Sequence, residues 1–144
     1  MPKTNSQLIN LVSFDLSRNS ISGSLPVDLP NVIALFSLYI NRNMLDGGLP
    51  STLYSITRLD EFYIQGHSLS GNITSMATLS GLWRLYLTRN DFTGTLERFA
   101  ELNYLELGRF EYIHINGTIP EKVPHMDQLS ECKVEVSMSS ECLL

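Results

Sequence analysis

Residues 14–26 read FDLSRNSISGSLP, and residues 38–50 read LYINRNMLDGGLP. The two stretches are variants of one pattern whose starts lie 24 positions apart (14 to 38). The pattern returns in weaker form over residues 62–73 and 85–96, and the ending Gly-Thr-Ile-Pro at 117–120 marks a fifth copy. Self-similarity at a fixed period of this length predicts a solenoid of stacked coils.

Between the copies, apolar residues recur every three positions. This step fits neither a 3.6-residue helix nor a plain alternating strand, but it fits a coil with one short strand and a loose or 3₁₀-like return. One such coil cannot cover its own apolar side, so several must stack around a shared core. The predicted core residues of these segments are Leu8, Leu11, Phe14, Leu29, Val32, Leu35, Leu38, Leu53, Ile56, Leu59, Phe62, Met76, Leu79, Leu82 and Leu85.

Each copy contains a predicted strand with an inward and an outward side. Side chains alternate along a strand, so Leu38 and Ile40 are expected to point inward while Tyr39 faces solvent. The turn after the strand carries a carboxamide in most copies, and this group can both donate to and accept from loop backbone groups that have no ladder partner. The predicted ladder consists of Asn19, Asn43, His67 and Asn90, with His67 in a structural role.

The fifth strand has two candidate registers. Residues 105–107 resemble the earlier strands by eye, whereas a constant period places the strand at 108–110 and puts Gly108 in a core position. We favour the constant period, which also makes 132–134 the start of a sixth, degenerate strand.

The whole chain, 1–144, is then predicted to be a single domain. Residues 1–7 are expected to cap the first coil, 8–131 to form about five repeats, and 132–144 to form the last coil and the C-terminal end.

The phrase Leu-x-Leu-x-x-Asn-x-Leu-x-Gly-x-Ile/Leu-Pro resembles the plant-type leucine-rich repeat. Repeats of this class occur in receptor-like kinases, receptor-like proteins, polygalacturonase-inhibiting proteins and protist surface proteins. The resemblance extends from Leu8 to Val134. It implies an α/β repeat fold, namely a right-handed solenoid of about six coils with a parallel β-sheet on its concave face, and it implies recognition of peptides, proteins or polysaccharides.

The outward position of successive strands predicts a binding surface. A row of tyrosines flanked by arginines suits a peptide backbone or a sugar ring, because Tyr and Arg are common at interaction hot spots. The alternative is that Tyr is a good strand former and stabilises the sheet without binding anything. The candidate residues are Tyr39, Tyr63, Tyr86, Arg18, Arg42, Arg89, Arg84, Glu61, Asn41 and Gln65.

Two further sets of residues concern modification. Asn72 and Asn116 begin Asn-x-Thr triplets, which are acceptors for N-glycosylation on a secretory route. Cys132 and Cys142 either form a disulfide that closes the last coil or remain reduced, with Cys132 buried as a small apolar residue.

Nothing in the sequence predicts catalysis, a metal or another cofactor. His67, His114 and His125 have no second histidine at metal-ligand spacing, and no nucleophile or phosphate-binding motif occurs. The net charge of −5 disfavours a nucleic-acid partner. No stretch is long and apolar enough to span a membrane.

Three hypotheses about function remain. The first is a recognition module for a protein, peptide or glycan in a surface or secreted receptor-like protein; the others are a capping or spacer segment of a longer array, and an inhibitor of a secreted polysaccharide-degrading enzyme. We expect an extracellular or cell-surface location, although residues 1–7 lack the apolar stretch of a secretion signal and a cytoplasmic location is the alternative.

Overall fold

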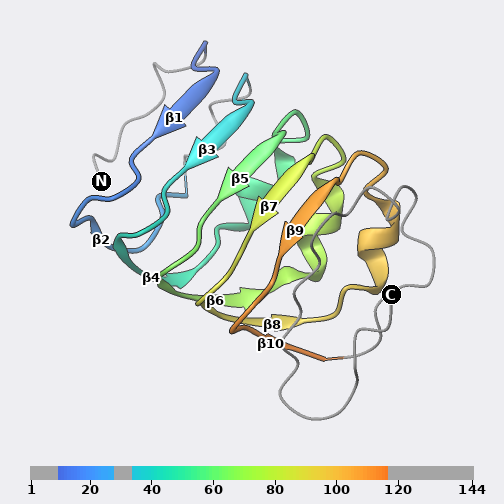
Figure 1. Ribbon diagram of the computed structural model, residues 1–144. Helices are drawn as coiled ribbons and strands as arrows, with labels where there is room; N and C mark the ends of the chain where they lie inside the picture. Colours follow the sequence, from blue (N-terminus) through green and yellow to red (C-terminus); the bar gives the residue numbers. More distant parts are fainter. Residues whose placement is uncertain (1–9, 28–33, 117–144) are drawn as a thin grey trace.

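The computed structural model describes residues 10–27 and 34–116, and these form stacked coils with parallel strands in two sheets (Figure 1). The first sheet contains the predicted strands in the order β1-β3-β5-β7-β9. Its strands are Ser13–Asp15 (β1), Ser37–Tyr39 (β3), Glu61–Tyr63 (β5), Arg84–Tyr86 (β7) and Leu107–Arg109 (β9). The leucine-rich-repeat solenoid predicted from the sequence is therefore the fold of the described residues.

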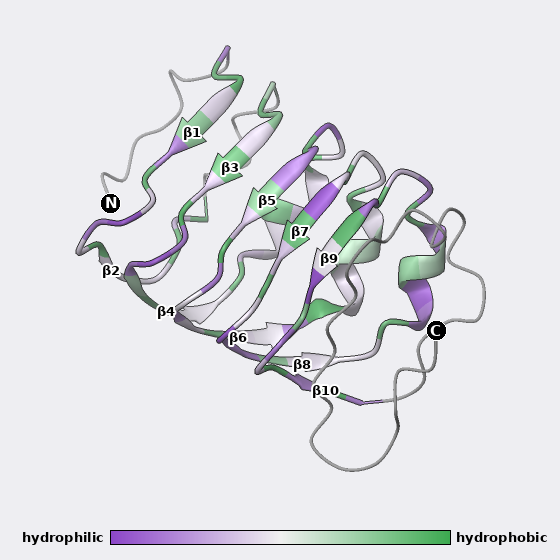
Figure 2. Ribbon diagram, viewed as in Figure 1, coloured by the Kyte–Doolittle hydropathy of each residue, from purple (hydrophilic) through white to green (hydrophobic). Residues whose placement is uncertain are grey.

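The strands of the first sheet alternate as predicted. Leu38 and Ile40 are fully buried, and Tyr39 between them is half-exposed. Phe14 and Leu16 in the first coil are only partly buried, although both pack against the core. The alternation of hydrophobic and hydrophilic residues can be followed along the strands in Figure 2.

The return segments contain 3₁₀ helices, as the three-residue apolar step predicts. They are Ser51–Ser55 (η2), Ile73–Thr78 (η3) and Glu97–Glu101 (η4). The backbone N–H groups of Ile56 and Leu59 donate to the carbonyls three residues earlier, at 3.1 and 3.0 Å. Each turn of three residues therefore returns an apolar side chain to the same buried face.

A second parallel sheet lies along another side of the coils and was not predicted. The order of its strands is β10-β8-β6-β4-β2. These strands are Ser22–Gly23 (β2), Met44–Gly48 (β4), Ser68–Asn72 (β6), Asp91–Gly94 (β8) and His114–Ile115 (β10). The strands are short and contain glycines with positive φ, such as Gly47 at 75° and Gly94 at 123°. Such glycines are typical of turns, which hid these strands in the sequence.

The register of the fifth strand follows the constant period. Leu85 pairs with Gly108 and Tyr86 pairs with Arg109, so the alternative strand over residues 105–107 is wrong. Leu105 is buried instead in the segment between the turn at 103–104 and the strand.

The ring of Phe110 occupies the space that a side chain at Gly108 would need, because a Cβ built on Gly108 would overlap it. Phe110 also meets Phe99 edge-on at 5.7 Å between ring centroids. A glycine in the core position is thus compensated by a phenylalanine two residues later. The predicted sixth strand at 132–134 lies outside the described residues.

Candidate functional site

The predicted tyrosine row forms on the outward side of the first sheet. Tyr39 pairs with Tyr63, and Tyr63 pairs with Tyr86, in the parallel register of β3, β5 and β7. The ring centroids lie 5.0 Å apart for Tyr39–Tyr63 and 4.3 Å apart for Tyr63–Tyr86, with tilted or edge-on planes. Arg109 continues the row, with its guanidinium 5.5 Å from the Tyr86 ring centroid. We call Tyr39, Tyr63 and Tyr86 the tyrosine row.

A charged pair fixes one side of the tyrosine row. Arg84 donates to a carboxylate oxygen of Glu61 at 3.0 Å, and the hydroxyl of Tyr39 donates to the other oxygen of Glu61. Burial raises the pKa of Tyr39, and the hydrogen bond to Glu61 raises it further. The phenol therefore stays protonated near neutral pH and can act as a donor.

Arg18, Arg42 and Arg89 occupy the turn that follows each strand. Their φ angles are 57°, 58° and 58°, which is the left-handed region, and Gly66 takes the same place in the third coil with φ 81°. A non-glycine residue there costs about 1 kcal/mol. All three arginines are exposed. Their position beside the tyrosine row was predicted from the sequence, but their left-handed backbone was not.

Two polar candidates precede these turns. The backbone carbonyl of Asn41 accepts from the N–H of Arg18, and that of Gln65 accepts from the N–H of Arg42, each at 2.9 Å. The side-chain oxygen of Gln65 is buried and has no hydrogen-bond partner within the described part of the chain. These residues hold neighbouring coils together through their backbones.

The asparagines at the predicted ladder positions bind backbone groups of two coils. Asn90 donates to the carbonyls of Leu87 and Ile64 at 2.9 and 2.8 Å, and its oxygen accepts from the N–H of Leu69 at 3.2 Å. Asn43 repeats this arrangement one pair of coils earlier, with bonds of 2.8 to 3.0 Å. Among the described residues, Asn19 bonds within its own coil, to the carbonyls of Leu16 and Ser17.

His67 takes the ladder position of the third coil. Its Nε2 lies 2.9 Å from the carbonyl oxygen of Ile40, and a carbonyl only accepts, so Nε2 carries the proton. Its Nδ1 is buried without a partner among the described residues. Burial lowers the pKa of His67, which favours the neutral ring.

The two predicted glycosylation residues are exposed. Asn72 ends β6, and its side-chain oxygen accepts from the N–H of Thr74 at 2.8 Å, which caps η3. Asn116 follows β10 and donates its backbone N–H to Gly94. Cys132 and Cys142 lie outside the described residues, as does His125.

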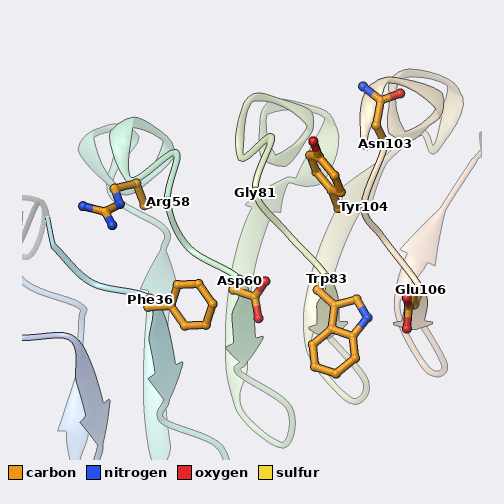
Figure 3. Close-up of a pocket in the computed structure, with 8 residues that line it drawn as sticks. All are labelled: Phe36, Arg58, Asp60, Gly81, Trp83, Asn103, Tyr104 and Glu106. Atoms are coloured by element: carbon orange, nitrogen blue, oxygen red, sulfur yellow. The ribbon is translucent and has the colours of Figure 1, made fainter.

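The structure also contains a groove that sequence analysis missed. It lies along the edge where the strands of the first sheet begin, and its volume is about 870 Å³ (Figure 3). The signal that would have revealed it is the residue before each strand, read down the repeats. The lining residues are Phe36, Arg58, Asp60, Gly81, Trp83, Asn103, Tyr104 and Glu106.

The described residues offer neither a metal site nor a membrane-spanning helix. Among residues 10–27 and 34–116, no group of three or more His, Cys, Asp and Glu side chains could hold a metal ion. In the same residues, no helix combines the length and the apolar character that crossing a bilayer requires.

Comparison with known proteins identifies the repeat class. A family model described as Leucine Rich Repeat matches residues 10–32. No curated protein sequence matches the chain. Solved structures do match, and those described next are ectodomains of plant receptor kinases.

Three of these ectodomains are from Arabidopsis thaliana. GASSHO1/SCHENGEN3, in complex with CASPARIAN STRIP INTEGRITY FACTOR 2, is 29% identical with a TM-score of 0.73, and the match covers 83% of this chain and 14% of the receptor chain. HAESA with an N-terminally extended IDA peptide hormone is 29% identical with a TM-score of 0.82. The match covers 89% of this chain and 22% of the HAESA chain. SOBIR1 is 26% identical with a TM-score of 0.72, and the match covers 78% of this chain and 64% of the SOBIR1 chain.

The chain thus spans about a seventh to a fifth of the two ligand-bound receptor chains and under two thirds of the SOBIR1 chain. The repeat pattern, the two parallel sheets and these matches all indicate a leucine-rich-repeat fold of the plant type. The matched structures are ectodomains of receptor kinases.

Proposed function

We propose that this chain, a plant-type leucine-rich-repeat protein, is a recognition module that binds a protein or peptide through the tyrosine row. The row carries the proposal because it joins three half-exposed aromatic rings in one line. Tyrosine supplies a large contact area at a low cost in side-chain entropy, since only two torsions are fixed on binding. Two of the matched ectodomains are described as complexes, one of them with a peptide hormone.

The surroundings of the row fit an extended ligand. The Tyr39 phenol is anchored by Glu61, and Glu61 is in turn held by Arg84, so this end of the row is oriented before a ligand arrives. Such preorganisation reduces the entropy lost on binding. Arg18 and Arg42 are exposed and form no ion pair with any described acidic residue, so their charges are available to a ligand.

The test begins with a phage-displayed library of random 12-residue peptides, selected against the whole 144-residue chain. Enriched peptides are then measured by calorimetry against the triple variant Tyr39→Ala/Tyr63→Ala/Tyr86→Ala. We expect affinity to fall at least about tenfold, the size expected when several hot-spot residues are truncated.

The matched control is a triple variant on the 3₁₀ side, Ser51→Ala/Ser75→Ala/Glu97→Ala, which removes exposed side chains without touching the first sheet. It should bind as the parent does. Equal affinity of both triple variants, with circular dichroism unchanged, would place the binding surface elsewhere and reject the proposal.

We also propose that the module belongs to a surface or secreted receptor-like protein. The exposed acceptors Asn72 and Asn116 support this location. Expression through a eukaryotic secretory route with an added signal peptide, followed by intact mass before and after glycan removal, should reveal attached glycan. The variants Asn72→Gln and Asn116→Gln assign each site, and a soluble product without glycan would count against the proposal.

A second candidate function is a capping or spacer segment of a longer array. The observation in its favour is the first coil, where Val12 is 57% exposed and Phe14 and Leu16 remain only partly buried. An adjoining repeat would cover such side chains. Supplying a synthetic upstream repeat in cis should raise the unfolding midpoint of the chain if this candidate is correct, and should leave it unchanged otherwise.

A further inference from the structure

One side of the groove is lined by the residue that precedes each strand of the first sheet. Phe36, Asp60, Trp83 and Glu106 each stand just before a strand of the first sheet, in four successive coils. Their backbones form a continuous chain of hydrogen bonds, from Asp60 to Phe36, from Trp83 to Asp60 and from Glu106 to Trp83, at 2.8 to 3.0 Å. Aromatic and acidic side chains therefore alternate in a fixed row, which is visible in Figure 3. We call these four residues the edge row.

The upper wall of the groove is open at its centre. The positions two residues before Asp60, Trp83 and Glu106 are Arg58, Gly81 and Tyr104. Packing excludes a side chain at Gly81, because a Cβ there would lie 2.7 Å from the carbonyl oxygen of Thr57. Tyr104 is 69% exposed. Figure 3 shows Gly81 between Arg58 and Tyr104, so the wall is lowest between these two larger side chains.

The acids of the edge row are not neutralised by ion pairs within the described part of the chain. Neither Asp60 nor Glu106 forms an ion pair with a described residue, whereas the neighbouring Glu61 is already held by Arg84. Burial raises the pKa of Asp60, and the negative charges of Glu61 and Glu106 raise it further, whereas the positive charge of Arg84 lowers it. Among the described lining residues Arg58 is the one cation, and the guanidinium of Arg84 lies against Trp83. A positively charged ligand would relieve the repulsion among the acids.

The aromatic members of the edge row are Trp83 and Phe36. The guanidinium of Arg84 lies 3.7 Å from the Trp83 ring centroid, so it stacks on the indole and helps to orient it. Phe36 is 45% exposed although it is a large apolar residue inside a hollow. Aromatic-lined grooves of this kind bind polyproline II segments, because such segments are stiff and lose little entropy on docking.

The spacing of the edge row selects one ligand geometry. Neighbouring strands lie about 4.8 Å apart, so Asp60 and Glu106, two coils apart, are separated by about 9.6 Å along the row. A polyproline II helix rises about 3.1 Å per residue and repeats every third residue, so equivalent side chains recur about every 9.3 Å. Side chains at positions i and i+3 of such a segment match the two acids.

We propose that the edge row is a second docking site, separate from the tyrosine row, for a proline-rich polyproline II peptide with basic residues three positions apart. The basic side chains pair with Asp60 and Glu106, and the intervening prolines pack against Phe36 and Trp83. This site does not depend on the tyrosine row, which lies on the strands themselves rather than before them.

The chain offers a direct readout, because Trp83 is the single tryptophan in the sequence. The probe is the capped peptide Lys-Pro-Pro-Lys-Pro-Pro-Lys, titrated into the whole chain while tryptophan emission is recorded. We expect a saturable change in emission that weakens with added salt, as contacts between exposed charges do. A peptide of the same composition with its three lysines adjacent, and one with glutamine in place of lysine, should bind at least about threefold more weakly.

Two variants separate the acids of the edge row from general charge. Asp60→Asn/Glu106→Gln should weaken binding of the spaced peptide about five- to tenfold, which is the size expected for two half-exposed ion pairs. Glu97→Gln removes one negative charge on η4, away from the groove, and should leave affinity unchanged. Arg58→Gln should tighten binding about twofold, because it removes the cation that opposes the ligand.

Several results would overturn the proposal. Emission that does not respond to the spaced peptide, or equal binding of the spaced and adjacent-lysine peptides, would reject the geometry. Equal binding of the glutamine peptide would indicate an apolar ligand instead. Equal affinity of the double variant and Glu97→Gln, with both folded by circular dichroism, would reject the role of Asp60 and Glu106.

Discussion

Asn90 and His67 occupy the same position in neighbouring coils, yet they leave the backbone around them in different states. Asn90 satisfies two carbonyls and one N–H group across two coils. His67 donates to one carbonyl, that of Ile40, and its second nitrogen is buried with no partner among the described residues. The same repeat position can therefore hold either an uncharged amide that bonds to two coils or a titratable imidazole that bonds to fewer backbone groups.

The difference follows from the chemistry of the two side chains. A carboxamide carries two donors and an acceptor on one small planar group, so it can serve three backbone groups at once. A neutral imidazole carries one donor and one acceptor on opposite sides of a ring, and turning the donor toward a carbonyl fixes where the acceptor points. His67 therefore joins its coils less completely than Asn43 or Asn90 does.

The largest loss of stability should come from removing the Asn90 side chain, which bonds to three backbone groups. Asn90→Ala leaves the Leu87 and Ile64 carbonyls and the Leu69 N–H without their partner in the core, and each loss costs about 1 kcal/mol or more, giving about 3 kcal/mol in total. Urea unfolding at pH 7.5 measures the change. Asn103→Ala, at an exposed asparagine, should change stability by no more than about 0.5 kcal/mol. Equal losses in the two variants would show that the ladder position is not special.

The substitution His67→Asn gives the third coil the same ladder side chain as its neighbours. His67→Asn supplies a second donor and an oxygen acceptor, and we expect it to stabilise the protein by about 1 kcal/mol, the usual net value of a hydrogen bond. The same urea measurement applies. His114→Asn, at an exposed histidine in β10, is the matched control and should be neutral. A destabilised His67→Asn protein would mean that packing of the imidazole matters more than its missing bonds.

A smaller effect should appear on acidification. Burial lowers the folded-state pKa of His67 below its ordinary value of 6.5, so folding favours the neutral ring. The resulting stability is complete above pH 6.5 and is lost as the pH falls through the folded pKa. Wild type should therefore lose stability faster than His67→Asn as the pH falls below 6.5, in unfolding curves at matched pH. His114→Asn should follow wild type, and parallel curves for all three proteins would contradict the argument.

Much of this arrangement could be read from the sequence. The 24- and 23-residue period fixed the first sheet, and the three-residue apolar step indicated the 3₁₀ returns because both depend on which side chains must be buried. The tyrosine row followed from strand alternation. The register of β9 was predictable from the period even though a glycine stands in the core.

The remaining features depend on contacts between coils. The second sheet was hidden because its short strands contain turn-like glycines such as Gly71. The left-handed backbone of Arg42 was hidden because arginine does not mark it, although Gly66 at the equivalent position does. The edge row was missed because its members share a position but not a residue type, so Phe36 and Asp60 do not look like copies of one another.

The smallest effect should come from the ladder residue of the first described coil. Among the described residues, Asn19 donates to the Leu16 and Ser17 carbonyls, and both bonds are exposed. Water replaces such bonds readily, so Asn19→Ala should cost about 0.5 kcal/mol, the low end for a hydrogen bond. Urea unfolding of Asn19→Ala and Asn90→Ala under the same conditions gives the ratio of the two stability losses. A loss at Asn19 as large as at Asn90 would imply that residues outside the described part complete its clamp, and the contrast between amide and imidazole would then extend along the whole ladder.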